Sequence, residues 1–242
     1  QEHSTTAVPL GSILVSAAFP PQAFIHIRHL LVSFPTTPNK AGLLVGLLSQ
    51  ASLLATQGHT LASAANTSAD VSCLAQSILD IAEGAQGADS HPLGAQCAAL
   101  GVTATGDTFG LLTPPDAGAS SNYQSKTGYL SDAAAHASLA ASQSDATAII
   151  RLYAGKVDIC IANVQQWALQ LISQSRALLA HPTDSATLQS VALLTAKLYA
   201  GVDANGDGRT DAIAGEGGAL QAYQSGQQMA ALTLTAPAGS GR

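Results

Sequence analysis

The spacing of apolar residues limits the fold of this chain more than any other feature. Hydrophobic side chains recur every three or four positions between prolines and glycines, whereas the alternation typical of β-strands is nearly missing. The first such segment, residues 22–33, follows Pro20 and Pro21, and proline is favoured in the first turn of a helix. Its apolar positions are Phe24, Ile27, Leu30 and Leu31. The pattern predicts an all-α fold.

The same pattern recurs along the chain and predicts helices at about 39–65, 67–83, from 131 onward, 145–180, 183–201 and 219–232. Gly84 and Gly201 follow two of these segments, as glycine often does at helix C-termini. Residues 85–128 lose the pattern, and a loop this long in a compact domain is either functional or covers other elements. The acids just before it, Asp80 and Glu83, are interpreted as a solvated helix face.

The two halves of the chain are similar to each other. Residues 39–84 and 155–201 share helix lengths and a glycine ending, and Asn39-Lys40 corresponds to Gly155-Lys156 at the helix opening. Chance likeness between alanine-rich helices is the alternative. We expect an up-and-down helical bundle built from an internally duplicated helical hairpin, with long Gly/Ser/Pro-rich loops. Its halves, residues 1–128 and 129–242, would form one pseudo-symmetric domain.

Charge excludes two classes of partner. Only 10% of residues are charged, and nine Lys and Arg stand against fifteen Asp and Glu without any basic cluster. Because phosphate binding needs a basic patch, nucleic acid is not an expected partner. No stretch reaches the roughly 18 to 20 apolar residues of a membrane span. A surface so rich in alanine and poor in charge suits packing against a protein partner or copies of the same chain.

The chain's start and its cysteines bear on its compartment. It begins at Gln1 and contains a single methionine, Met229, so a removed signal peptide would explain the start, as would a chain cut short. We expect an extracytoplasmic, secreted or periplasmic, location. The cysteines permit one disulfide, and pairing Cys73 with Cys97 would tie the long loop to the helix before it; three buried free thiols, Cys160 included, are the alternative.

The most specific motif follows Gly201 and reads Asp203-Ala-Asn205-Gly-Asp207-Gly208-Arg209-Thr-Asp211. Alternate side chains on a tight loop can converge on one hard cation. The segment resembles the D-x-N-x-D-G-x-x-D calcium loops of EF-hand and dockerin-type proteins. It departs from them at Ala214, which stands where an EF-hand has a bidentate Glu. The resemblance implies Ca²⁺ bound by Asp203, Asn205, Asp207, the Arg209 carbonyl, Asp211 and, reaching back, Glu216; a polar turn without an ion is the alternative.

Histidines provide a second candidate site. His26 and His29 lie three residues apart on one predicted helix, and a bundle can gather them with His59 and His136 around a transition metal or a haem. No C-x-x-C-H, G-x-S-x-G, Walker or H-E-x-x-H motif occurs, so no enzyme is predicted. The expected function is a non-enzymatic, calcium-stabilised extracytoplasmic scaffold or subunit. The alternative is a metal or haem carrier that uses these four histidines.

Overall fold

The computed structural model describes residues 20–63, 67–112 and 128–231. Within these ranges every regular element is helical and no strand occurs, which confirms the all-α prediction. The elements are α1 (Pro21–Leu31), the short 3-10 helix η2 (Pro38–Lys40), α2 (Leu43–Leu61), α3 (Ser68–Glu83), α4 (Ala95–Ala99), α5 (Tyr129–Ser142), α6 (Ala148–Ala180), α7 (Ser185–Ala200) and α8 (Ala219–Met229).

Local sequence explains where α3 and α7 begin and end. Thr67 and Asp70 form a reciprocal capping box at the start of α3, and the Asp184 carboxylate accepts backbone N–H groups at the start of α7. The residues after the two helices, Gly84 and Gly201, have φ angles of 69° and 76°, which glycine adopts without steric cost. The predicted ends of both helices are therefore confirmed.

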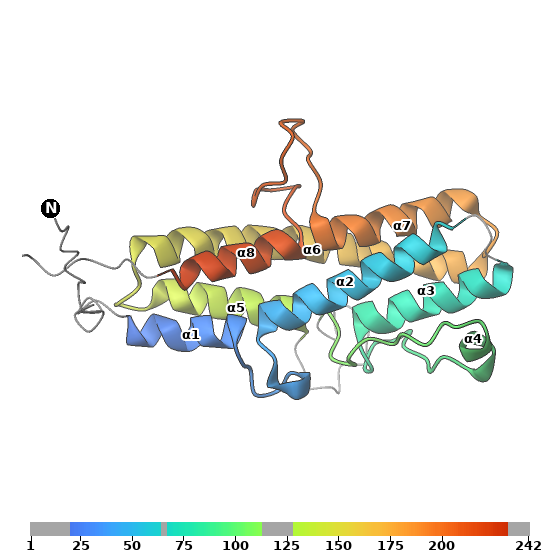
Figure 1. Ribbon diagram of the computed structural model, residues 1–242, viewed down its shortest axis with the longest axis horizontal. Coiled ribbons are helices and arrows are strands. Elements are labelled where there is room, and N and C mark those ends of the chain that lie inside the picture. Colours follow the sequence, from blue (N-terminus) through green and yellow to red (C-terminus); the bar gives the residue numbers. More distant parts are fainter. Residues whose placement is uncertain (1–19, 64–66, 113–127, 232–242) are drawn as a thin grey trace, which may run out of the picture.

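Figure 1 shows the long helices lying side by side along the long axis of the molecule. The 33-residue α6 packs against α3, α5, α7 and α8, while α2 packs mainly against α7 and α3. Small residues permit close approach, because a Cβ added at Gly46 would collide with Tyr129 and one added at Gly58 with Thr195. None of the helices in the described ranges is long and apolar enough to cross a membrane.

The two halves differ at their helix openings. Asn39 and Lys40 lie in η2 with φ angles of 55° and 54°, so α2 begins only at Leu43. Gly155 and Lys156 instead lie inside α6, which passes through them without interruption. The predicted correspondence between these openings is wrong, because α6 continues through Gly155 with helical residues on both sides. Residues 39–84 and 155–201 each still contribute to two packed helices, α2 with α3 and α6 with α7, and the duplication itself stays a prediction.

Residues 84–112, called the strap below, fold back along α3 and include α4 (Figure 1). A disulfide joins Cys73 of α3 to Cys97 of α4, as the sequence predicted, and Cys160 is a buried free thiol. The strap also meets the bundle through hydrogen bonds, since the Ser77 hydroxyl donates to the carbonyl of Ala104. The described part of the predicted long loop thus covers helices.

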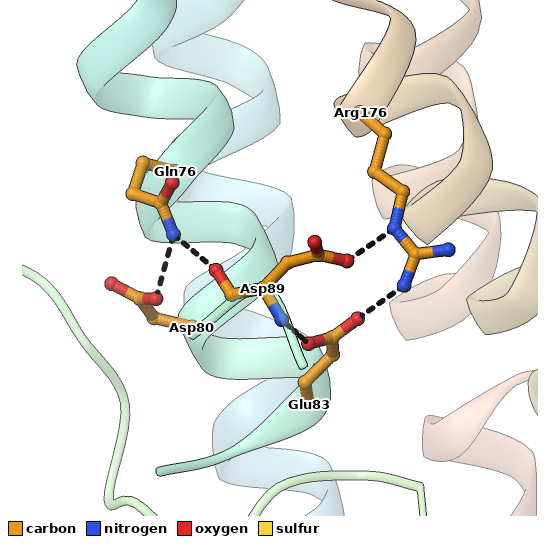
Figure 2. Close-up of polar contacts among 5 residues, drawn as sticks. All are labelled: Gln76, Asp80, Glu83, Asp89 and Arg176. Atoms are coloured by element: carbon orange, nitrogen blue, oxygen red, sulfur yellow. Dashed lines mark hydrogen bonds and ion pairs between the residues drawn. The ribbon is translucent and has the colours of Figure 1, made fainter. Parts of the chain in front are cut away.

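Charged and polar side chains hold the strap, and Figure 2 shows their contacts. Gln76 Nε2 donates to Asp80 Oδ1 at 2.9 Å and to the Asp89 carbonyl at 2.7 Å, while Glu83 Oε2 accepts the Asp89 N–H at 2.9 Å. Arg176 of α6 pairs with Glu83 at 3.1 Å and also with Asp89. Asp80 and Glu83 are 4% and 3% exposed, so the solvated-face interpretation is wrong: the strap covers them.

Candidate metal centre

Three histidines from two helices meet where α1 packs on α5. His26 and His29 lie one turn apart on α1, and His136 lies on α5. Asp145, in the connection after α5, fixes the start of α1, because its carboxylate accepts the N–H groups of Gln22 at 2.7 Å and Ala23 at 3.1 Å. This cap and the apolar face of α1 set the rotation that turns both histidines toward α5.

Two of the separations between ring nitrogens in this cluster match the spacing that a single ion requires. His136 Nδ1 is 3.1 Å from His26 Nδ1 and 3.4 Å from His29 Nδ1. Zn–N bonds of 2.0–2.1 Å place the nitrogens of a tetrahedral site about 3.3–3.4 Å apart. Among the described residues, this is the only group of three or more His, Cys, Asp or Glu whose ligand atoms all lie within 4.8 Å of one another.

The surroundings favour neutral imidazoles. The Phe34 ring stands edge-on to His29 and His136, with centroids 5.5 and 5.1 Å away, and all three histidines are half-buried. Burial, followed by the neighbouring His29 and His26, lowers the pKa of His136 to about 4. Burial, then His26 and Arg28, also lowers the pKa of His29. Neutral rings keep the lone pair that metal coordination uses.

Gln143 supports the cluster from outside. Its Nε2 lies 3.3 Å from His26 Nε2 and 3.1 Å from the carbonyl of Leu139, to which it donates. An amide offers a donor or an acceptor depending on its orientation, so Gln143 can engage the outer nitrogen of His26 while Nδ1 faces His136. Such outer contacts orient metal-binding histidines.

The structure brings together three of the four histidines predicted from sequence. His59 lies exposed near the end of α2 and is not part of the cluster. The ring centroids of His26 and His29 lie 5.2 and 4.7 Å from that of His136, so a single ion fits among these rings better than a porphyrin between two of them. Phe34 and Gln143 were missed, because nothing in the local sequence connects them to a histidine on another element.

The predicted calcium loop, residues 203–211, belongs to the loop at 201–218, which projects from the bundle between α7 and α8 (Figure 1). Its side chains fold inward onto backbone N–H groups. Asp203 accepts three of them at 2.7–3.2 Å, from Gly206, Asp207 and Gly208. Asn205 Oδ1 accepts the Asp207 N–H and Asp207 Oδ1 the Arg209 N–H, each at 2.9 Å. Asp203, Asn205 and Asp207 are thereby drawn into one compact turn.

Glu216 holds the base of this loop. It is 1% exposed and precedes α8, and its two carboxylate oxygens accept the N–H groups of Asn205 at 3.1 Å and Asp211 at 3.2 Å. It therefore reaches the loop from the predicted side, with both oxygens on backbone groups. Asn163 of α6, which sequence reasoning missed, bonds the backbone of residues 213, 215 and 217. Calcium binding by this loop stays a prediction.

Comparison with protein-family models, curated proteins and solved structures finds no match to this chain.

Proposed function

We propose that this protein binds one divalent transition-metal ion of the zinc class through His26, His29 and His136, in a non-enzymatic metal-handling role. The observation that carries the proposal is the convergence of three Nδ1 atoms from two helices, at 3.1 and 3.4 Å. Three imidazoles leave one position of a tetrahedral ion open to water or to an incoming ligand. An ion held this way can be received and passed on.

The donor set narrows the choice of metal. Imidazole nitrogen suits zinc, copper, nickel and iron, whereas calcium and magnesium prefer oxygen. The three ligands are neutral when they bind, so the ion would keep its full charge in a half-buried site. The ion would also fasten α1 to α5, since the ligands come from both helices.

The wider setting of the proposal is an extracytoplasmic bundle of two related hairpins that packs with a protein partner or with copies of itself. The Cys73–Cys97 disulfide supports an oxidising compartment, because disulfides are rare in the cytosol. The pairing of α2 with α3 and α7, and of α6 with α7 and α3, supports two related hairpins. In this setting the calcium loop would serve as a structural clamp between α7 and α8.

Calorimetric titration of untagged, metal-free protein with zinc and nickel salts tests the proposal. We expect one ion per chain, and His136→Ala should weaken binding by at least about 100-fold because it removes a direct ligand. His59→Ala is the matched control, since it removes an exposed helix histidine outside the cluster. Equal binding by the wild type and His136→Ala, or no binding by the wild type, contradicts the proposal.

A further inference from the structure

A second candidate site lies away from the histidines, in a cavity of about 460 Å³ between α3 and the strap. Cavities of roughly 300–1,000 Å³ are the usual size for small-molecule sites. One part of its wall is apolar and includes Pro92, Leu93 and Val102. Hydroxyl groups line the rest, from Ser90 and from threonines 103, 105 and 108.

A buried carboxyl group lines this cavity and lacks a full set of partners. Asp80 is 4% exposed. Its Oδ1 accepts Gln76 Nε2 at 2.9 Å and the His91 N–H at 3.0 Å. Its Oδ2 is buried and has no hydrogen-bond partner among the residues that the structure describes. A buried acceptor without a donor costs about 1–3 kcal/mol, and more when it is charged.

The charges near Asp80 compensate its burial only in part. Arg176 makes its two ion pairs with Glu83 and Asp89, and Figure 2 shows Asp80 directed away from both. Burial raises the pKa of Asp80, and the bonds that Oδ1 accepts from Gln76 and His91, the nearby Ser90 hydroxyl and the charge of His91 only partly offset this effect. A buried carboxylate whose charge is only partly compensated is stabilised by a ligand that brings a cation.

We propose that this cavity binds a small organic amine, whose ammonium group pairs with Asp80 and whose apolar body lies against Pro92, Leu93 and Val102. An ionised carboxylate only accepts hydrogen bonds, and an ammonium group offers three donors. Charge-assisted bonds of this kind are about twice as strong as neutral ones. The threonine hydroxyls can accept the remaining ammonium protons, and the net charge of −6 favours cations over anions.

The test compares two probes of the same shape, 2-phenylethylamine and 2-phenylethanol, by calorimetric or NMR titration of the intact protein. We expect the amine to bind at least about tenfold more tightly than the alcohol, a difference of about 1.4 kcal/mol. Failure of the amine to bind at millimolar concentration, or equal binding of amine and alcohol, overturns the proposal.

Variants assign the preference to Asp80. Asp80→Asn keeps an oxygen for Gln76 and the His91 N–H but removes the charge, so it should fold and lose the preference for the amine. Asp89→Asn alters the same strap without lining the cavity and should keep the preference. Ala85→Leu adds side-chain volume to the cavity lining and should weaken the binding of both probes. An amine preference that survives Asp80→Asn refutes the role of this carboxyl group. The result does not depend on metal binding, because the histidine cluster lies on α1 and α5.

Discussion

The strap and the loop at 201–218 leave their helices in the same way and then diverge. Each follows a helix that ends at a glycine of positive φ, whose N–H bonds the carbonyl four residues earlier: Gly84 to Asp80 and Gly201 to Lys197. The strap then lies along α3, whereas the loop at 201–218 projects from the bundle (Figure 1). Identical helix ends therefore do not decide the path of the following chain.

The positions of the acidic residues explain why the two segments take different paths. Asp80 and Glu83 belong to α3 and accept N–H groups of the strap, which a disulfide also holds. Asp203 and Asp207 belong to the projecting loop and accept N–H groups of that loop itself. Acidic residues on a bundle helix fix a covering segment through the hydrogen bonds that they accept from it. Acidic residues inside an exposed turn repel one another, and a bound cation would relieve this repulsion. The strap should therefore respond to thiol chemistry and pH, and the loop to cations.

Removing the disulfide should have the largest effect. Cys73 and Cys97 are 24 residues apart, and closing a loop of that size raises the free energy of the unfolded chain by about 3.5 kcal/mol. We expect the double variant Cys73→Ser with Cys97→Ser to lose about this much unfolding free energy in urea titrations. Limited proteolysis should cut the strap sooner, with the loop at 201–218 cut at an unchanged rate. Equal stability of the variant and the wild type would contradict this account of the strap.

Helix periodicity was enough to predict most of the fold, because it depends on local spacing. Segments 145–180 and 183–201 correspond to α6 and α7 within a few residues. The burial of Asp80 and Glu83 was not predictable, since it depends on a strap that returns from distant sequence and on Arg176, 93 residues beyond Glu83. The sequence predicts that α5 begins at residue 131, later than its actual start at Tyr129. The N-cap is Gly128, which has no side chain that could mark the start of a helix.

The metal centre shows the same division between local and distant information. The spacing of His26 and His29 on one helix was visible in the sequence, and so was the candidate His136. The choice between His136 and His59 depends on tertiary packing, because α1 contacts both α5 and α2 but only His136 meets the histidines of α1, and a single sequence carries no signal for that. The sequence predicts a cluster of these three histidines with His59, and the structure separates His59 from it.

Calcium should have the next largest effect, through the loop at 201–218. If the loop at 201–218 binds Ca²⁺ in the native state only, free calcium at 100 times the dissociation constant stabilises the protein by about 2.7 kcal/mol. Asp207→Asn is a clean variant, because it keeps the oxygen that accepts the Arg209 N–H and removes one charge. We expect chelation to lower the melting temperature of the wild type and to affect this variant much less. Identical wild-type melting curves with calcium and with chelator would leave the loop as a polar turn.

The smallest effect concerns the pH dependence of the strap. Burial raises the pKa of Glu83 to about 7 from an ordinary value of 4.5, although the Asp89 N–H and Arg176 oppose the shift. The folded protein therefore binds this proton more tightly than the unfolded chain does. The stabilisation is complete below pH 4.5 and is lost as the pH rises through 7. Between pH 6 and 8 the loss of this one proton from Glu83 lowers the unfolding free energy by about 1.4 kcal/mol.

Other groups titrate in the same interval, so the measured quantity must be a difference. The lowered pKa values of His136 and His29 act in the opposite direction, because the unfolded chain takes up their protons first. Glu83→Gln removes only the carboxyl proton, and it keeps an amide oxygen for the Asp89 N–H. Subtracting the pH profile of this variant from that of the wild type, by urea titration between pH 6 and 8, should leave a decline of about 1.4 kcal/mol. Parallel profiles would mean that Glu83 keeps an ordinary pKa, and that Arg176 compensates the cost of its burial.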